Sequence, residues 1–360
     1  MIDVAAKRDD VVALRQALQA LDAARMEREA ALETLNREMA SASSLARGLG
    51  YHEAPHEPQP ARRNRAMILL YHRVALVQPD PAGLCIAPPV FRAHMQHIAR
   101  SCEPMTLEAL TEAMLEDRLP PQAVAITLDD GYLDSLTASD ILIDLHLPAT
   151  FFVNSSAGGE TFLDSLARVF LGPHAIPPQL DLTILGAPLR LSCASDTGRC
   201  AAFDALREIG FPLSSDGRRE LIAALARWCS LDLAPRPSHR MLTPAEMREL
   251  ASRPGHAIGA HTHDHLFLPV QTRSAKIHEI SANRDYLQAL IGRPVSAFAF
   301  PYGAFDDETV SICRGLGFQS ATTVTGQAVR PWNDPLLMPR VEIRADTAAD
   351  FPAFVKRVLS

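Results

Sequence analysis

The sequence lacks most of the features that would place it outside the ordinary globular class. Its 360 residues contain no run of about eighteen apolar residues, the length that a membrane-spanning helix needs. The six cysteines are scattered, with no Cys-x-x-Cys pair, as is typical of buried thiols in a reducing compartment. There is no excess of basic residues, and the net charge of -7 argues against a nucleic-acid-binding protein. No apolar stretch follows the opening MIDVAAKRDD, so we expect no secretory signal and a cytoplasmic location.

The first 47 residues lack both Gly and Pro and are rich in Ala, Leu, Glu and Arg. This composition predicts a helix, and its apolar residues follow a heptad spacing that Arg25 and Arg28 interrupt. We therefore expect residues 1–47 either to self-associate as a coiled coil or to lie on the domain as an exposed helix. Residues 48–66 contain Gly, Pro and charge without a period, and we expect them to form a linker.

From residue 67 to the end, short apolar runs alternate with helical patterns. Continuous apolar runs are typical of strands that are buried on both faces of a parallel sheet. The runs are 67–72, 123–128, 149–154, 256–261, 297–302, 320–325 and 337–343. About seven strands that alternate with helices predict an α/β fold, and a barrel rather than an open sheet.

Residues 155–240 break this alternation within the domain at 67–360. We expect three helices and one hairpin there, at 160–171, 197–208, 215–229 and 181–193. The segment is interpreted as an insertion between two strands of the barrel. Because loops at the carboxyl ends of barrel strands carry function, it could form one wall of a substrate site. It could equally be an appendage that only packs on the barrel.

Two clusters of potential metal ligands follow apolar runs. Asp129 and Asp130 end the run at 123–128, and adjacent carboxylates are costly unless something such as a cation stabilises them. Neighbouring side chains of a strand point in opposite directions, so one Asp can ligate while the other acts as a base. His261 and His265 belong to the segment HTHDH after a second apolar run. Taken singly, the first cluster could be a turn and the second a polar loop.

Together the clusters supply one carboxylate and two imidazoles, from Asp130, His261 and His265. A set of three protein ligands leaves room for water and is typical of a catalytic rather than a structural metal site. We expect one divalent ion, with zinc the first candidate. Such an ion polarises a carbonyl group and lowers the pKa of water.

The order of four motifs, TLDDG, ATFFV, GAHTHDH and FAFPYG, resembles the NodB-homology polysaccharide deacetylases of carbohydrate esterase family 4. The resemblance covers roughly residues 66–345, and ILLYHRV and PLLMPRVEI resemble a bacterial branch of that family. It implies a deformed (β/α)7 barrel and an enzyme that removes N-acetyl groups from an amino-sugar polysaccharide, oligosaccharide or glycoconjugate. In the family the first Asp of the pair is the general base, here Asp129. The second Asp and the two His bind zinc or a related cation, matching Asp130, His261 and His265.

The resemblance also assigns a role to the Pro-Tyr-Gly segment. A backbone N–H, here that of Tyr302, stabilises the oxyanion in the family. Without the resemblance, this segment would be interpreted as a plain turn between a strand and a helix.

The sequence departs from the family pattern at two positions. An Arg that orients the base usually stands two positions before the Pro, where this sequence has Ala299. Arg340 is the candidate surrogate, unless it forms a surface ion pair. Its replacement by Ala is expected to cost on the order of 10²-fold in turnover, with little change in stability. The usual Leu-x-His motif, which supplies the general acid, is also missing; His72 is the candidate substitute, unless it is a structural His.

Three functions remain open on this evidence. The first is removal of N-acetyl groups from a glycan, which would be the expected partner. The second is deformylation or hydrolysis of another small amide on the same scaffold. The third is a non-catalytic glycan-binding or assembly protein whose site has decayed. The complete Asp-Asp and two-His set argues against decay, whereas the missing Arg and Leu-x-His keep it open.

Overall fold

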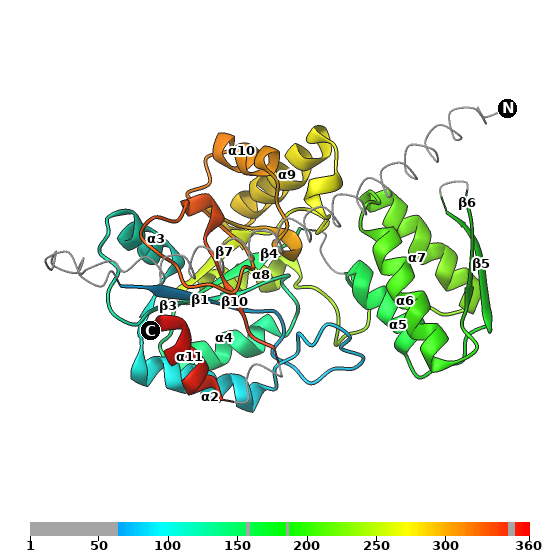
Figure 1. The fold of residues 1–360 in the computed structure, drawn as a ribbon, viewed down its shortest axis with the longest axis horizontal. Coiled ribbons are helices and arrows are strands. Elements are labelled where there is room, and N and C mark those ends of the chain that lie inside the picture. Colours follow the sequence, from blue (N-terminus) through cyan, green and yellow to red (C-terminus); the bar gives the residue numbers. More distant parts are fainter. Residues whose placement is uncertain (1–63, 156–158, 185–186, 345–349) are drawn as a thin grey trace, which may run out of the picture. The chain divides into compact units, whose positions relative to one another are not determined.

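The computed structural model describes residues 64–155, 159–184, 187–344 and 350–360 (Figure 1). The predicted helix at 1–47, its self-association, and nearly all of the predicted linker lie outside these residues and stay predictions. The described chain divides into two compact units. One contains the hairpin of β5 (Gln179–Ile184) and β6 (Ala187–Ser192), and the other contains the remaining described residues.

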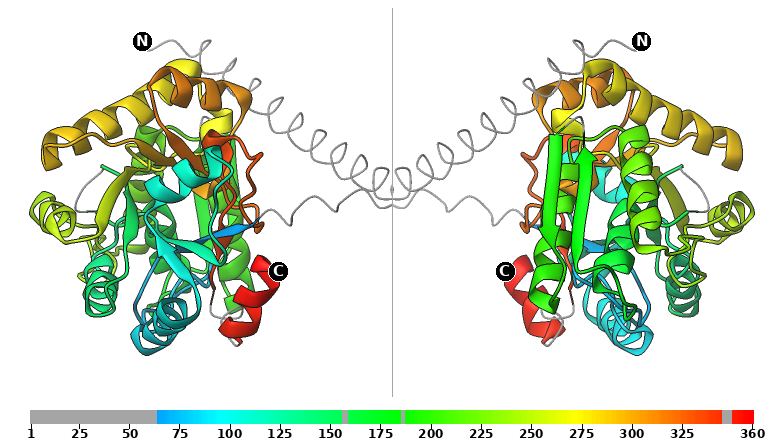
Figure 2. Two further views of the ribbon diagram at one scale, coloured as in Figure 1. Left: turned by 90° about the vertical axis from the view of Figure 1, so that its left-hand side faces the viewer. Right: turned by 90° about the vertical axis from the view of Figure 1, so that its right-hand side faces the viewer.

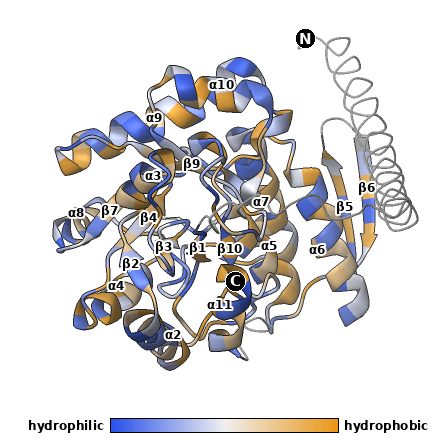
Figure 3. Cartoon of the chain, turned by 60° about the vertical axis from the view of Figure 1, so that its left-hand side comes forward, coloured by the Kyte–Doolittle hydropathy of each residue, from blue (hydrophilic) through white to orange (hydrophobic). Residues whose placement is uncertain are grey.

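A parallel sheet forms the framework of the larger unit. Within the described residues it has eight strands, in the order β10-β1-β3-β4-β7-β8-β9 with β2 beside β3. The strands are β1 (Ala66–Tyr71), β2 (Glu103–Met105), β3 (Ala123–Leu128), β4 (Ala149–Val153), β7 (His256–Ala260), β8 (Ala297–Ala299), β9 (Ser320–Thr322) and β10 (Val341–Glu342). The sheet is curled (Figure 3). A bridge between Thr322 and Met338 connects β9 to the segment before β10. The predicted α/β fold is confirmed, and the barrel is a half-barrel.

The central strands are buried on both faces, as their continuous apolar runs predict. All residues of β1 and β3 are buried. Alternate residues of β1 enter different cores because side chains of a strand alternate between its two faces. Met67 and Leu69 belong to the larger core, whereas Ile68 packs in a second one with Phe152 and Ala299.

Helices surround the strands (Figure 3). They are α2 (Pro88–Ser101), α3 (Leu107–Leu115), α4 (Ser135–Asp144), α8 (Pro244–Ser252), α9 (Arg273–Ile291), α10 (Asp307–Gly315) and α11 (Phe351–Leu359). The sequence of α8 explains where it begins, because Thr243 and Glu246 form a reciprocal capping box and Pro244 occupies the first turn. None of the described helices is long and apolar enough to cross a membrane.

The predicted insertion is present as three helices and a hairpin. The helices are α5 (Phe162–Leu171), α6 (Asp196–Gly210) and α7 (Ser215–Cys229), and α5 packs against the other two. The hairpin, seen face-on in the right-hand view of Figure 2, is antiparallel, with Leu180 opposite Leu191. The helices belong to the same unit as the sheet, whereas the hairpin does not.

Candidate active site

The predicted site residues gather at the carboxyl ends of the strands. Asp129 and Asp130 directly follow β3, His261 follows β7, and His72 follows β1. Parallel strands present their carboxyl ends at one edge of the sheet, so these segments meet there. They line a cavity of about 970 Å³, together with residues of the inserted helices. The predicted residues in its lining are His72, Asp129, Asp130, His261, His265 and Tyr302.

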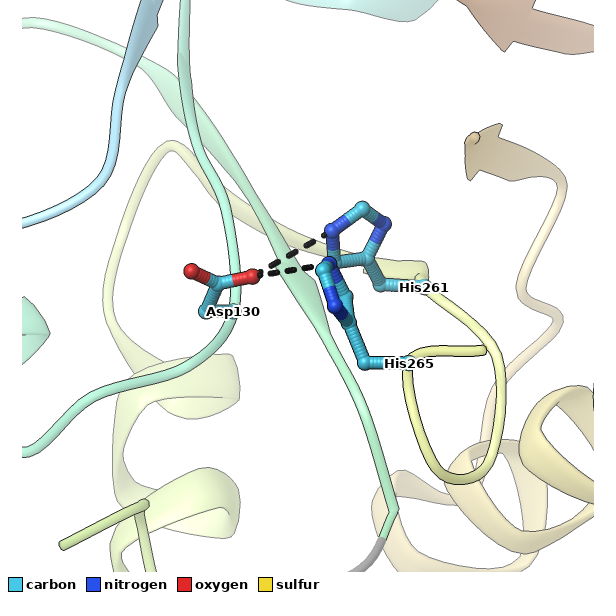
Figure 4. A group of neighbouring side chains, drawn as sticks. All are labelled: Asp130, His261 and His265. Atoms are coloured by element: carbon cyan, nitrogen blue, oxygen red, sulfur yellow. Dashed lines mark ion pairs between the residues drawn. The ribbon is translucent and has the colours of Figure 1, made fainter. Parts of the chain in front are cut away.

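Asp130, His261 and His265 form a cluster that could hold a metal ion. Asp130 Oδ1 lies 3.4 Å from His261 Nε2 and 3.3 Å from His265 Nε2, and the three side chains point toward one another (Figure 4). All three potential ligand atoms lie within 4.8 Å of one another. His261 Nδ1 is 2.8 Å from the Ala299 carbonyl oxygen, which can only accept. Nδ1 must therefore carry the proton, and Nε2 is free to ligate. The donor set fits zinc or a related cation.

A helix that the sequence did not single out holds the loop of the two His. The His261 N–H donates to Asn283 Oδ1 at 2.9 Å, and Asn283 Nδ2 donates to the Val153 carbonyl at 3.1 Å. Glu279, one turn earlier in α9, accepts from the Asp264 N–H at 2.8 Å. Both side chains are at most 3% exposed. In the sequence, the signal for this role is the spacing of Glu279 and Asn283, two polar residues four positions apart on the helix face that packs on the sheet.

The backbone at the site is turned into unusual conformations. Eight non-glycine residues of the described chain have positive φ, and half of them are at the site: Asp130, Thr262, His265 and Tyr302. Each costs roughly 1–3 kcal/mol and persists only where the surroundings fix it. Gly131 follows at φ +79°, and a Cβ there would lie 2.0 Å from Val153 Cγ1. The Asp-Asp-Gly motif therefore requires its glycine for a tight turn against β4.

Arg340 reaches Asp129 from the interior of the protein. Its Nη1 donates to Asp129 Oδ1 at 2.7 Å and its Nη2 to Oδ2 at 2.6 Å. Nη1 also donates to Thr127 Oγ1 at 3.2 Å, and the Arg340 side chain is fully buried. The predicted contact with the base is present, and a surface ion pair is excluded. The catalytic consequence of the contact stays a prediction.

The charges of the site keep both carboxylates ionised. Burial raises the pKa of the Asp129 carboxyl, but the Arg340 guanidinium and His261 outweigh burial, so the pKa is lowered. The pKa of Asp130 is lowered as well, because the neighbouring imidazoles outweigh burial. Burial lowers the pKa of His265 to about 3, whereas the two carboxylates outweigh burial at His261 and raise its pKa. A cation would compete with that proton for Nε2.

Tyr302 and His72 also face the cavity. Tyr302 lies in the short helix η2 (Pro301–Gly303) with φ +60°, and the hydrogen bonds of this turn are donated by Gly303 and Ala304. The turn thus leaves the Tyr302 N–H for other use. His72 Nδ1 lies 3.8 Å from Glu342 Oε1 and has no hydrogen-bond partner among the described residues. Glu342, in β10, lines the cavity too and was not anticipated from the sequence.

The family model for polysaccharide deacetylases matches residues 116–321. The chain belongs to this family. The assignment to polysaccharide deacetylases, and with it the predicted enzyme class, is confirmed. The matched range contains Asp129, Tyr302 and the metal cluster, but neither His72 nor Arg340. The two proposed surrogates therefore rest on the structure of this deacetylase and not on the family match.

Solved structures of other deacetylases share the fold. The Streptococcus pyogenes deacetylase PplD in complex with acetate is 19% identical, with a TM-score of 0.54 over 82% of this chain and 98% of that one. IcaB from Ammonifex degensii is 16% identical, with a TM-score of 0.52 over 81% of this chain and 97% of that one. The de-N-acetylase from Aggregatibacter actinomycetemcomitans is 15% identical, with a TM-score of 0.50 over 82% of this chain and 100% of that one. A search of curated protein sequences found no significant match.

The inserted helices of this deacetylase form one side of the cavity. Side chains from α5, α6 and α7 line it, among them Phe162, Phe203, Arg218 and Ile222. Of the two roles considered for the insertion, a wall of the site therefore fits better than an appendage. Its apolar and basic side chains line the same cavity as the carboxylates and imidazoles of the strand ends.

Proposed function

We propose that this protein is a metal-dependent hydrolase that removes N-acetyl groups from an amino-sugar polysaccharide, oligosaccharide or glycoconjugate. The observation that carries the proposal is the placement of Asp129 beside the cluster of Asp130, His261 and His265. A base and three potential ligands then share one cavity of about 970 Å³. That volume is at the upper end of ligand pockets and suits a substrate larger than a simple amide.

Asp130, His261 and His265 would hold the cation. When bound, a divalent ion such as zinc would polarise the acetamido carbonyl and lower the pKa of a water molecule. Asp129, kept ionised by Arg340, takes the proton from the attacking water. The Tyr302 N–H donates to the oxygen that becomes negative during the attack. His72 protonates the departing amine, and Glu342 Oε1 lies 3.8 Å from its Nδ1.

The alternative functions predict different products and different metal contents. A deformylase on the same scaffold would release formate, and a decayed glycan-binding protein would release nothing. The buried pair of Asp129 and Arg340 favours a working site over a decayed one. Burying two charges is costly, and a site with no base to orient has no need of such a pair.

The direct test is acetate release from N-acetylglucosamine oligomers of increasing length, from N-acetylated polymers and from the matching N-formyl compounds. We expect acetate release that is lost after treatment with a chelator and restored by one equivalent of zinc or another divalent ion. Formate release alone would favour the deformylase. A metal-loaded, folded protein that releases neither acid from any of these compounds would contradict the proposal.

A further inference from the structure

Arg218 of α7 connects the inserted helices to the loop that carries His265. Its side chain is 5% exposed and lines the cavity. Nε donates to the Gly210 carbonyl at 2.9 Å, Nη2 to the Phe211 carbonyl at 3.3 Å, and Nη1 to the His265 carbonyl at 3.0 Å. All three acceptors are main-chain carbonyls. Hydrogen bonds to the backbone therefore compensate the buried charge.

Two of these bonds anchor the guanidinium within the insertion. Gly210 is the last residue of α6 and Phe211 its C-cap, so their carbonyls lie at the negative end of the helix dipole. The guanidinium also lies 5.2 Å from the ring centre of Phe162 in α5. A Cβ on Gly210 would lie 2.2 Å from the Phe162 ring, so the glycine permits this close packing. Residues of all three inserted helices therefore fix the position of the Arg218 guanidinium.

The third bond leaves the insertion and reaches a potential metal ligand. His265 has a left-handed backbone with φ +52°, and its N–H donates to Thr262 Oγ1 at 3.1 Å. Arg218 fixes the carbonyl at the other side of the same residue. The Tyr302 hydroxyl donates to the same carbonyl at 3.4 Å. These bonds orient the His265 backbone and hence the direction from which Nε2 approaches Asp130.

A cluster of aromatic rings makes a second connection at the same place. The Phe211 ring, at the end of α6, packs 5.1 Å from the Tyr302 ring and 5.6 Å from the Phe267 ring. The Tyr302 ring in turn lies 4.6 Å from the imidazole of His265. The inserted helices therefore contact both the His265 loop and the turn that contains Tyr302.

We propose that Arg218 is a positioning residue, through which the inserted helices hold His265 in the conformation that binds the metal ion. The inference rests on the proposed function, because it takes Asp130, His261 and His265 to be the ligands. It adds that the insertion is part of the metal centre as well as a wall of the cavity. An arginine that only capped the end of α6 would need just the hydrogen bonds to the Gly210 and Phe211 carbonyls. The third hydrogen bond of Arg218 goes to the carbonyl of His265, a potential metal ligand.

Metal binding by an Arg218→Gln variant tests this role. We expect its affinity for zinc to fall by about 10- to 100-fold, the usual effect of losing a group that orients a ligand. The visible absorption spectrum of the cobalt-loaded variant should also differ from that of the unaltered protein, because His265 is no longer held in one orientation. Arg218→Lys, which keeps the charge and one donor, should recover part of the affinity and serves if the Gln variant fails to fold.

Arg199 offers a matched control. Like Arg218 it stands in an inserted helix and bonds to main-chain carbonyls, those of Phe170 and Gly172 at the end of α5. It makes no such bond to the His265 loop. Arg199→Gln should lower the melting temperature by an amount similar to Arg218→Gln and leave zinc affinity and the cobalt spectrum unchanged.

The outcomes separate this inference from the proposed function. Zinc affinity and a cobalt spectrum that are unchanged in folded Arg218→Gln would overturn the positioning role and leave the metal site intact. Equal losses in the Arg218 and Arg199 variants would also overturn it, because the effect would then be one of general stability. Failure of the unaltered protein to bind any divalent ion would overturn both.

Discussion

Asp129→Asn is expected to reduce the rate of acetate release by about 10²- to 10⁴-fold, the contribution of a positioned general base. Zinc affinity should change little, because Asp129 bonds to Arg340 and need not ligate the ion. Asp130→Asn should lose both activity and zinc, since its Oδ1 lies between the two imidazoles. Rates and zinc titrations on the two variants measure this difference. Equal loss of zinc in both would show that the two carboxylates have been assigned wrongly.

The fold of the Asp129 variant must be controlled, because the substitution leaves Arg340 buried without its carboxylate. Removing one partner of a buried ion pair typically costs about 3–5 kcal/mol. Asp129→Asn combined with Arg340→Met removes both charges and should recover much of the lost stability. It should recover none of the activity. A double variant as active as the unaltered protein would exclude Asp129 as the base.

Arg340→Ala is expected to lower turnover on the order of 10²-fold, as a residue that orients and ionises the base. Its effect should pass entirely through Asp129. In the Asp129→Asn background, the Arg340 substitution should therefore reduce turnover no further, which a double-mutant cycle measures. Arg340→Lys should be nearly as slow, because an ammonium cannot form the two parallel bonds. Additive losses in the cycle would contradict a role through Asp129.

The same substitution should cost several kcal/mol of stability, and here the expectation from the sequence is corrected. Little change in stability was predicted from the sequence, but Arg340 and Asp129 are both buried. Folding lowers the pKa of Asp129 from its ordinary 3.8. The pair therefore stabilises the fold fully above that value, and its contribution declines as the pH falls below it. Denaturation of Arg340→Ala and the unaltered protein should differ by a constant amount between pH 5 and pH 8.

Local patterns predicted the strands and the metal cluster because both depend on short segments. The buried runs at 123–128 and 256–261 became β3 and β7, each one or two residues away from a potential ligand. Parallel pairing then brought Asp130 and His261 together without further information. Arg340 was found only by asking which residue could replace the arginine missing at Ala299. Its burial was missed because burial depends on packing that no local pattern records.

Contacts between distant segments could not be predicted in this way. Arg218 and His265 are 47 residues apart, and the bond between them depends on how α6 ends. No local pattern distinguishes Asn283 from other polar residues, and its bond to the His261 N–H became visible only in the structure. The insertion was predicted as one segment, whereas its hairpin belongs to a different unit from its helices. Composition and periodicity carry no signal for that division.

The central claim, that Asp130, His261 and His265 hold one divalent ion, is tested most directly by the zinc content of the metal-loaded, dialysed protein. We expect one ion per chain in the unaltered protein and none in His261→Ala or His265→Ala. His263→Ala is the matched control from the same loop, because His263 Nδ1 is 2.7 Å from Ser155 Oγ and is not in the cluster. It should keep its ion. Zinc retained by His265→Ala, or lost equally from all three variants, would contradict the account.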